Sequence, residues 1–494
     1  MDIVMVSSEA IPFAKTGGLA DVVGTLPSRL AGLGHRCSVF LPAYSRVFQA
    51  GVAVQDAKIG FVVDMDGKPK AVRLLKATVG DPAVDFYFID QPHYFERPHL
   101  YGDQHSDYQD NCERFAFFSR SVVRAIERIG LPVDVVHCHD WQSGLVPAYM
   151  RTRMGGFEWY NHAACVMTIH NLAYQGRYWV NDMHWTGLDW RYFTMERMEF
   201  YNDVCFLKTG ITFADMVSTV SPNYAQEIQK PELGCGMDGV LRGLGDRLTG
   251  IVNGVDYQVW DPMRDTLLPQ PYGVENWEAG KAACKAHLQK ILGLSVDPKV
   301  PVIGLVGRLA SQKGWDLVLE LIQKSLPCNS VQWAILGSGE HRFQSALQEI
   351  AKRSPERVGI RIEFSDRMAH AIESGADMFL MPSQYEPCGL NQLYSLRYGT
   401  VPIVHAVGGL VDTVTDVSDY TLQDGSATGF VFYDYALDSL SECVDRSLDT
   451  FTREPMVWKQ IVETGMRQDW SWTKSALHYE SLYKRACAMP RMTE

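Results

Sequence analysis

The sequence predicts an α/β protein built from two doubly wound halves. Short apolar runs alternate with helical patterns along the 494 residues, which is typical of βαβ units that form parallel sheets covered on both faces. Polar residues follow several of these runs, where each strand is expected to end. A chain of this length exceeds one ordinary hydrophobic core, so we expect two large domains.

The first half begins with its clearest βα unit. Residues 3–7 form an apolar run, residues 15–18 a loop with glycines, and residues 37–41 a second apolar run. Between the loop and the second run, apolar residues recur at helical spacing, which predicts one buried helix face. These residues are Leu19, Val22, Val23, Leu26, Leu30 and Leu33. We expect further strands at residues 133–137, 165–169 and 216–220.

A second series of apolar runs follows residues 250–256 and predicts the second half. Its expected strands are residues 302–306, 331–336, 360–364, 378–381 and 401–404. In open α/β sheets, ligands bind beyond the carboxyl ends of the strands. Two doubly wound halves that face each other would therefore enclose a central cleft, where we expect the chemistry.

The composition excludes several classes of partner. The formal net charge of -12 disfavours nucleic acids and acidic membranes, because both require a basic surface. Eleven cysteines, an odd number without a C-x-x-C pair, indicate reduced thiols. The N-terminus carries no basic leader, and no apolar run approaches membrane-spanning length, so we expect a cytoplasmic protein.

Residues 15–21 (KTGGLAD) place two glycines and a lysine at a strand-to-helix turn. Free backbone N–H groups at a helix N-terminus, with a lysine beside them, suit a diphosphate. A plain turn that needs glycine for its geometry explains the same residues. The motif alone leaves both interpretations open.

Two motifs contain possible metal ligands. Residues 137–141 (HCHDW) offer several ligands, but ligands in consecutive positions rarely satisfy tetrahedral geometry. We favour a polar strand end that either hydrogen-bonds a substrate or only satisfies its own loop. For a substrate, Asp140 with Trp141 suits a sugar, with the carboxylate on its hydroxyls and the ring on its apolar face. Residues 64–66 (DMD) precede a glycine between two strand-like runs, which favours a hairpin turn over a metal–diphosphate site. We therefore expect no metal, and expect protein cations to neutralise phosphate charge.

Three loops of the second half carry candidate residues. Residues 307–314 (GRLASQKG) place Arg308 and Lys313 at a helix N-terminus, although most such side chains are simply solvated. Gly337 follows another strand and permits a nucleotide to approach. Residues 383–390 (SQYEPCGL) contain one carboxylate and one thiol. Because no histidine lies nearby in sequence to activate the thiol, we expect Glu386 to bind hydroxyls and Cys388 to pack near the sugar.

Together these motifs resemble those of bacterial glycogen synthases and plant starch synthases, in the same order and over nearly the whole chain. The matching segments are residues 15–22, 139–141, 168–176, 219–222, 253–256, 307–314 and 386–390. The resemblance implies a GT-B fold, in which two Rossmann-like domains face a central cleft. It implies an acceptor-side domain over residues 1–250, a donor-side domain over residues 251–469, and a helix within residues 470–494 that crosses back to the first domain.

The resemblance also implies an activity: retaining transfer of glucose from ADP-glucose to the non-reducing end of an α-1,4-glucan such as glycogen, with release of ADP and without a cofactor. The residues that it places at the reaction centre are His170, Arg308, Lys313 and Glu386. Those that it places around the donor are Lys15, Gly17, Gly18, Asp21, Gly337, Cys388, Gly389 and Leu390, and those that it places at the acceptor are Glu9, Asp140 and Asn171. Related GT-B transferases carry a second glutamate where this chain has Tyr394, so the ribose contact is unassigned.

Three other functions share parts of this pattern. Another GT-B transferase, using UDP-glucose or making a small glucoside, would differ in its donor and in the length of its product. A glucan-binding protein without turnover is disfavoured because the residues assigned to the reaction centre are all retained. A nicotinamide-dependent oxidoreductase is disfavoured because the full glycine fingerprint and the ribose-binding acid that follows it are missing.

Overall fold

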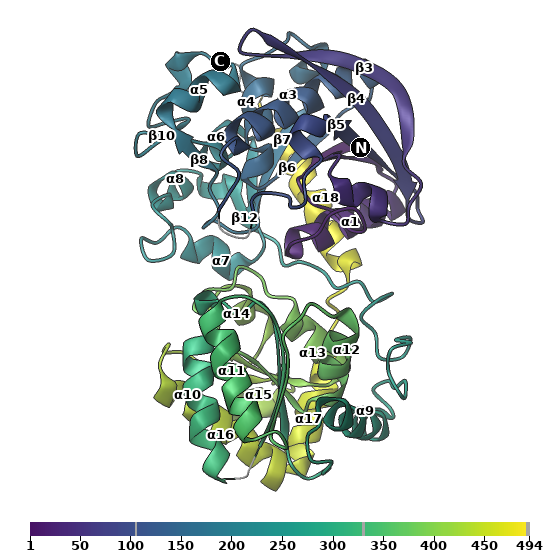
Figure 1. The fold of residues 1–494 in the computed structure, drawn as a ribbon, viewed down its shortest axis with the longest axis vertical. Helices are drawn as coiled ribbons and strands as arrows, with labels where there is room; N and C mark the ends of the chain where they lie inside the picture. Colours follow the sequence, from purple (N-terminus) through teal and green to yellow (C-terminus); the bar gives the residue numbers. More distant parts are fainter. Residues whose placement is uncertain (104–105, 329–330, 491–494) are drawn as a thin grey trace. The chain divides into compact units, whose positions relative to one another are not determined.

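The computed structural model describes residues 1–103, 106–328 and 331–490. The chain divides into two compact units: unit 1 comprises Met1–Gly254 with Trp472–Glu494, and unit 2 comprises Val255–Ser471 (Figure 1). Each unit has its own sheet with helices packed against it. In the described parts of the chain, no helix is long and apolar enough to cross a membrane.

Unit 1 contains a nine-stranded sheet with the order β12-β11-β7-β6-β1-β2-β5-β4-β3. Its strands are β1 (Asp2–Val6), β2 (Arg36–Pro42), β3 (Gln55–Met65), β4 (Lys68–Val79), β5 (Val84–Asp90), β6 (Val135–His139), β7 (Ala164–Ile169), β11 (Met216–Thr219) and β12 (Leu248–Gly250). Pairing is parallel from β12 to β5 and antiparallel along β5, β4 and β3. The parallel part is the doubly wound sheet that the sequence predicted.

The helices of unit 1 are α1 (Gly18–Gly32), α2 (Pro92–Phe95), α3 (Asn111–Ile129), α4 (Leu145–Arg151), α5 (Met183–Thr186), α6 (Phe206–Phe213), α7 (Pro222–Glu227), α8 (Asp238–Arg242) and α18 (Trp472–Ala488). The predicted stripe of α1 is buried up to Leu30, whereas Leu33 lies beyond the helix end and is exposed. A small antiparallel sheet of β8 (Arg177–Trp179), β10 (Asp203–Cys205) and β9 (Glu199–Phe200) completes the unit.

The hairpin of β3 and β4 confirms the turn predicted for residues 64–67. Asp66 and Gly67 both have positive φ, 54° and 72°, which is the backbone of a two-residue type I′ turn. The backbone N–H of Gly67 donates to the Asp64 carboxylate at 3.1 Å. These aspartates therefore close a hairpin.

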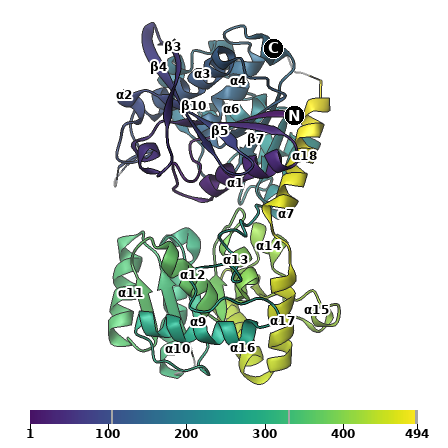
Figure 2. The ribbon, with the colours of Figure 1, turned by 90° about the vertical axis from the view of Figure 1, so that its right-hand side faces the viewer.

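The last helix, α18, packs on unit 1 although it follows the whole of unit 2 in sequence. It contacts α1, β6 and β7, and lies beside α1 in Figure 2. Tyr479 and Tyr483 on its inner face are fully buried. Ser475 Oγ donates to the Val252 carbonyl at 2.8 Å, so the returning segment is tied to the segment that leaves the unit.

Unit 2 contains a six-stranded parallel sheet with the order β15-β14-β13-β16-β17-β18. Its strands are β13 (Val302–Val306), β14 (Gln332–Leu336), β15 (Val358–Arg361), β16 (Met378–Met381), β17 (Val401–His405) and β18 (Phe430–Phe432). Its helices are α9 (Trp277–Leu292), α10 (Trp315–Ser325), α11 (His341–Arg353), α12 (Asp366–Gly375), α13 (Asn391–Tyr398), α14 (Gly409–Thr413), α15 (Asp419–Gln423), α16 (Leu437–Arg453) and α17 (Pro455–Arg467).

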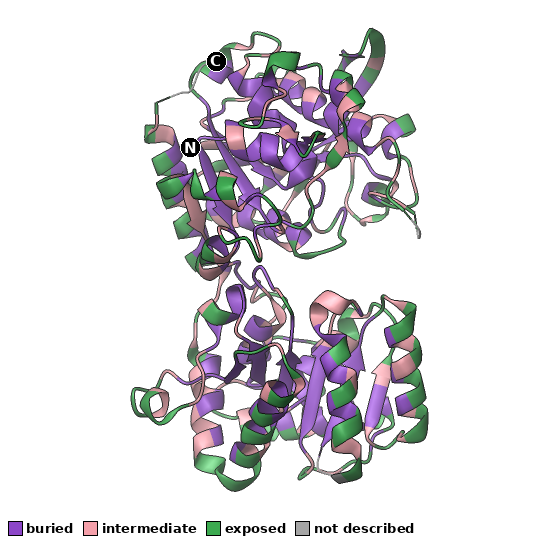
Figure 3. Ribbon diagram, turned by 90° about the vertical axis from the view of Figure 1, so that its left-hand side faces the viewer, coloured by how far each residue is buried: buried purple, intermediate pink, exposed green. Residues whose placement is uncertain are grey.

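Apolar side chains along the central strands of unit 2 point alternately to the two faces of the sheet, and they form a hydrophobic core on each face. Ile303 and Leu305 of β13 join one hydrophobic cluster, whereas Val302 joins the other. Trp333 and Ile335 of β14 likewise lie on the opposite face from Ala334 and Leu336. Successive side chains of a strand point to opposite faces, so burial on both faces explains the continuous apolar runs (Figure 3).

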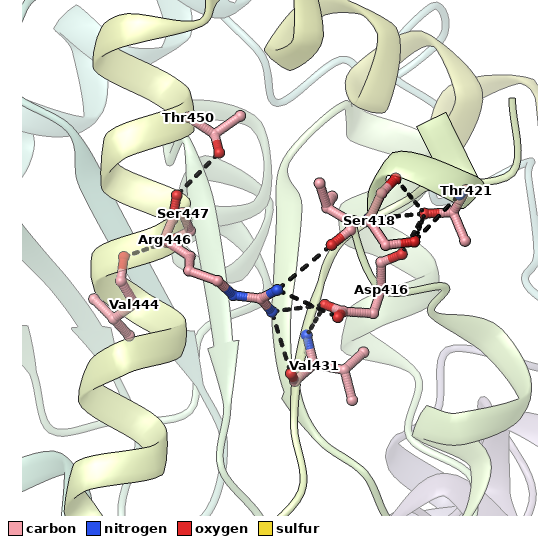
Figure 4. Close-up of polar contacts among 9 residues, drawn as sticks. Asp416, Ser418, Thr421, Val431, Val444, Arg446, Ser447 and Thr450 are labelled. Carbon is pink, nitrogen blue, oxygen red and sulfur yellow. Dashed lines mark hydrogen bonds and ion pairs between the residues drawn. The ribbon is translucent and has the colours of Figure 1, made fainter. Parts of the chain in front are cut away.

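A polar network at the edge of the sheet fixes β18 to helix α16 in unit 2. Arg446 Nη2 of α16 donates to Asp416 Oδ1 at 2.8 Å, and the same carboxylate oxygen accepts the backbone N–H of Val431 at 2.8 Å (Figure 4). Ser418 and Thr421 form a capping box at the start of α15 beside it. One carboxylate therefore holds a helix, an edge strand and a loop together.

A buried ion pair in unit 1 gives a stability prediction. The Asp215 carboxylate accepts from the Arg151 guanidinium and from the backbone N–H of Cys165, and the two charged side chains are only 1% and 2% exposed. In Asp215→Ala the Arg151 charge is left buried and unpaired, so we expect the free energy of unfolding to fall by about 3–5 kcal/mol. Urea unfolding measures this loss.

The matched control is Glu349→Ala, which removes an exposed pair with Arg353 on α11. This substitution should lower the free energy of unfolding by less than about 0.5 kcal/mol, because exposed ion pairs one helical turn apart contribute little. Equal losses in the two variants would contradict the prediction for Asp215.

Candidate active site

Each sheet has one point at which its strand order reverses. In unit 1 the chain passes from β1 to β2 on one side, and later adds β6 on the other side of β1. In unit 2 it proceeds from β13 to β14 and β15, then returns to place β16 on the other side of β13. The loops at the carboxyl ends of these central strands diverge, which is where open α/β sheets bind ligands.

Glu9 follows β1 and holds the glycine loop of unit 1. Its buried carboxylate accepts from Thr16 Oγ1 at 2.6 Å, from the backbone N–H of Thr16, and from the Tyr101 hydroxyl at 2.6 Å. Burial and the neighbouring Glu9 charge raise the pKa of Tyr101 well above its usual value. The local role of Glu9 is thus to fix residue 16, directly before Gly17 and Gly18.

Gly17 precedes α1 in extended backbone with φ −159° and ψ −167°, and no side chain caps the helix. A Cβ built on Gly17 meets no atom within 4 Å. Neither backbone conformation nor packing therefore requires glycine here. A ligand that approaches the open helix N-terminus does explain it.

Lys15 and Asp21 form an ion pair across the same loop. The Lys15 ammonium lies 2.7 Å from Asp21 Oδ1, and both side chains remain partly exposed. Asp21 is in the first turn of α1, so it holds the Lys15 charge close to the helix N-terminus. In this arrangement Asp21 orients the lysine.

Asp140 follows β6 and clamps the loop that follows β7. Its Oδ1 accepts the backbone N–H of His170 at 2.7 Å, and the backbone N–H of Asn171 also donates to the carboxylate. Burial, with a smaller contribution from the charge of Glu9, raises the pKa of Asp140 to about 7. Asn171 Oδ1 in turn accepts the backbone N–H of Ala173 at 3.0 Å. The structure thus brings together Asp140, His170 and Asn171.

Three buried histidines lie at this strand end. His139 Nδ1 lies 3.0 Å from His170 Nε2, and His137 contacts the hydroxyls of Thr168 and Tyr483. Burial lowers the pKa of His137 and of His170 to about 3, and that of His139 well below its usual value. All three rings are therefore neutral near pH 7. Among the described residues, no group of three His, Cys, Asp or Glu side chains is arranged to hold a metal ion.

In unit 2, the loops after β13 and β16 bring together Lys313 and Glu386. The Lys313 ammonium lies 2.5 Å from Glu386 Oε2, which also accepts from Ser383 Oγ at 3.0 Å. Lys313 ends a short 3-10 helix (Ser311–Lys313) before α10, and Glu386 is buried. A charge-assisted contact thus joins the two loops at the switch point.

Gln312 links these loops further and was missed by sequence reasoning. Its side-chain amide donates to the Tyr385 carbonyl at 2.9 Å, and the backbone carbonyl of Gln312 accepts the backbone N–H of Gln384 at 2.9 Å. Arg308 Nη2 lies 3.4 Å from Gln312 Oε1. Arg308 is therefore held beside the loop of Glu386. An uncharged side chain between two cations gave no signal of this bridging role.

Two glycines in this region are required by close approach of the backbone. A Cβ on Gly337 would lie 2.1 Å from the Gly307 carbonyl oxygen, so packing of the loops after β13 and β14 explains this glycine. Gly408 has φ +48°, and its Cβ would lie 1.9 Å from the Glu386 carbonyl oxygen. The same oxygen accepts the backbone N–H of Gly409 at 3.1 Å. The Gly-Gly pair was the available signal for this contact.

The loop that follows Glu386 is held by the first turn of helix α13. Cys388 is buried, and its carbonyl accepts from Gln392 Nε2 at 3.1 Å. Gly389 adopts a positive φ of 73°, and Leu390 directly precedes helix α13. The backbone at Cys388 and Gly389 is therefore held by the first turn of that helix.

Two aromatic groups complete the description of unit 2. Tyr394 stacks on Trp260 with ring centroids 4.0 Å apart, and Trp260 stacks on His370 at 3.8 Å.

Phe364 lies beyond the end of β15 and is 81% exposed. The strand predicted for residues 360–364 was therefore wrong in its bounds, since pairing ends at Arg361. An exposed ring at the carboxyl edge of the sheet is suited to stacking on a ligand.

Comparison with known proteins places this geometry in one family. Residues 2–243 match the model of the starch synthase catalytic domain, and residues 293–454 match that of glycosyl transferases group 1. The chain is 47% identical to a glycogen synthase of Rhodopirellula baltica, with 99% of both chains covered. It is 45% identical to a glycogen synthase of Syntrophotalea carbinolica, covering 98% of this chain and 99% of the other.

Solved structures agree with the sequence comparison. The catalytic domain of starch synthase IV from Arabidopsis thaliana, bound to ADP and acarbose, superposes with a TM-score of 0.91 at 31% identity, and 99% of each chain is covered. A sucrose-phosphate synthase from Thermosynechococcus elongatus shares the fold at 18% identity, with a TM-score of 0.60 and 98% of each chain covered. The chain thus belongs to the glycogen synthase and starch synthase family of glycosyltransferases, and its fold is the two-domain GT-B fold.

Proposed function

We propose that this protein transfers glucose from ADP-glucose to the non-reducing end of an α-1,4-glucan, with retention of the α configuration and release of ADP. The relatives at 47% and 45% identity are named glycogen synthases, and the similar starch synthase structure holds ADP and acarbose. The observation that carries the proposal is the group of Arg308, Lys313 and Glu386 at the switch point of unit 2, where Gln312 joins Arg308 to the loop of Glu386. We also propose that the donor and the glucan are its partners in the cytoplasm, which the ten cysteines found as free thiols support.

Protein cations stabilise the diphosphate in this proposal. Arg308 and Lys313 meet the developing negative charge of the leaving group, and preorganised donors of this kind lower the barrier of group transfer. Lys15 and the backbone N–H groups at Gly17 and Gly18 provide a second set of donors, at a helix N-terminus. No metal ion takes part.

Neutral and acidic side chains bind the sugars. Glu386 accepts hydroxyls of the donor glucose, with Cys388, Gly389 and Leu390 forming the loop beside it, and Gly337 belongs to the donor side. Phe364 offers an exposed ring on which the base can stack. Glu9, Asp140 and Asn171 belong to the acceptor side. His170 lies beside the transferred glucose and is neutral, because burial holds its pKa at about 3.

The same groups support a front-face mechanism. The acceptor hydroxyl attacks C1 of the donor glucose on the face from which ADP departs, so the configuration is retained. The proton of that hydroxyl passes to the leaving phosphate oxygen, because His170, whose pKa burial holds at about 3, is too weak a base to accept it. The bond from C1 to the phosphate oxygen breaks as the bond from C1 to the acceptor oxygen forms.

The function is tested by nucleotide release in the presence of EDTA. We expect purified protein mixed with glycogen to release ADP from ADP-glucose, and to release little UDP from UDP-glucose. Omission of glycogen is the control and should abolish release. A preference for UDP-glucose would replace the proposal with another GT-B transferase, and absence of release from either donor would replace it with a binding function.

Removal of either cation should lower turnover without unfolding the protein. In Arg308→Ala and in Lys313→Ala we expect kcat to fall by about 10² to 10³, the loss typical for one preorganised donor to a developing charge. Lys459→Ala is the matched control, since Lys459 pairs with Glu278 on the surface. Steady-state kinetics measure kcat, and thermal melting checks folding. Near-normal turnover in folded Arg308→Ala and Lys313→Ala would remove both residues from the mechanism.

Gly17→Ala should separate ligand binding from folding. Its added Cβ meets no protein atom within 4 Å and the backbone is extended, so we expect an unchanged melting temperature. Because that methyl group occupies the approach to the helix N-terminus, the KM for ADP-glucose should rise at least about tenfold.

The contrasting variant is Gly337→Ala, whose Cβ would lie 2.1 Å from the Gly307 carbonyl oxygen. It should lower the melting temperature. An unchanged KM in Gly17→Ala would remove the glycine loop from the donor site.

A further inference from the structure

The three buried histidines of unit 1 form a row that ends at His170. The ring centroids of His137 and His139 are 4.0 Å apart, and those of His139 and His170 are 5.3 Å apart. His137 and His139 are on β6, and His170 directly follows the neighbouring strand β7. Only His170 is assigned a contact with substrate in the proposed function, so the other two require a separate explanation.

Only one assignment of donors and acceptors around His137 gives the buried tyrosine proton an acceptor. Tyr483 OH lies 2.8 Å from His137 Nδ1, and Thr168 Oγ1 lies 2.6 Å from His137 Nε2. If the buried hydroxyl of Tyr483 donates to Nδ1, the proton of His137 is on Nε2 and is donated to Thr168. Thr168 then donates to Ser218 Oγ at 2.6 Å. The opposite direction would leave the tyrosine proton buried without an acceptor.

The contact between His139 and His170 also has a preferred direction. His139 Nδ1 is 3.0 Å from His170 Nε2, whereas His139 Nε2 is buried without a hydrogen-bond partner. A proton on that Nε2 would be an orphaned buried N–H group, which is rarer in proteins than an under-satisfied acceptor. The proton of His139 is therefore on Nδ1 and is donated to His170 Nε2.

This donation determines what His170 presents to a ligand. With Nε2 accepting, the neutral ring of His170 carries its proton on Nδ1. Within the described chain Nδ1 has no hydrogen-bond partner, and His170 retains 9% exposure. The ring takes up no second proton near neutral pH, because burial holds the pKa of His170 at about 3.

We propose that His139 is a positioning residue that holds His170 as the Nδ1–H tautomer, so that His170 presents a neutral N–H donor to an oxygen of the transferred glucose. The inference rests on the proposed function for the location of the substrate. The hydrogen-bond direction itself does not depend on it. A purely structural His139 would fill the core at this place and leave the tautomer of His170 unspecified.

Two substitutions of His139 separate these roles. In His139→Asn the side-chain amide nitrogen occupies the position of Nδ1 and can still donate to His170. In His139→Leu the volume is kept and the donor is lost. Tyr483→Phe is the matched control, since it removes a buried hydrogen bond to His137 in the same core and leaves the pair of His139 and His170 untouched.

The first measurement is ring ¹⁵N NMR of histidine-labelled protein, with the signals of His170 assigned by their loss in His170→Ala. We expect a protonated Nδ1 and an unprotonated Nε2 in the wild type, in His139→Asn and in Tyr483→Phe. In His139→Leu we expect averaging between the two tautomers. A wild-type proton on Nε2, or an unchanged tautomer in His139→Leu, would overturn the inference.

The second measurement is kinetics with ADP-glucose and glycogen. His139→Leu should lower kcat/KM for the donor about 10- to 100-fold, as is typical when a residue that orients a site residue is lost, and should leave KM for glycogen unchanged. His139→Asn and Tyr483→Phe should retain most of the activity. Equal losses in His139→Asn and His139→Leu would overturn the inference. Normal turnover in His170→Ala would instead contradict the proposed role of His170, while the NMR result for the pair would stand.

Discussion

Both units depend on the same constraint: parallel strands joined by crossover connections place all their carboxyl ends on one edge of the sheet. The strand order can reverse at one point of that edge, and there the loops diverge instead of covering each other. Unit 1 reverses between β1 and β6, and unit 2 between β13 and β16. The candidate residues follow these four strands or their neighbours, so the topology, more than any single motif, determines which side chains meet.

At these edges, hydrogen bonds and ion pairs between loops hold the candidate side chains in fixed positions. In unit 1 the Glu9 carboxylate holds Thr16 before the glycine turn, and Asp140 holds the backbone at His170. In unit 2 the pair of Lys313 and Glu386 joins two loops, with Gln312 bridging the same loops beside it. Such preorganisation is what group transfer needs, since donors that are already oriented need not reorganise as charge develops.

Much of this arrangement could be predicted from the sequence, and the failures have physical causes. The strands at residues 302–306 and 378–381 were predicted with their observed bounds, because they are apolar on both faces. The strand predicted for residues 133–137 in fact spans Val135–His139. Its polar end looked like a loop, but His137 and His139 lie within the sheet, where each has a buried hydrogen-bond partner. Gln312 could not be recognised, because its partners are distant in sequence, whereas the Gly-Gly pair at Gly408 was a signal that the sequence analysis missed. Burial, which depends on tertiary packing, also decides the charge states of Asp140 and His170.

The two units differ in how deeply their candidate site residues are buried. In unit 1, desolvation keeps His137, His139 and His170 neutral and raises the pKa of Asp140 to about 7. In unit 2, Lys313 is partly exposed and forms an ion pair with Glu386. Neutral hydrogen-bonding groups suit sugar hydroxyls, which are themselves uncharged, whereas fixed cations suit a diphosphate. A diphosphate that approaches Lys313 competes with Glu386 for the same ammonium group. In the proposed function, donor binding would therefore loosen the carboxylate from its lysine as the carboxylate meets the glucose hydroxyls, which would couple recognition of the phosphate to recognition of the sugar.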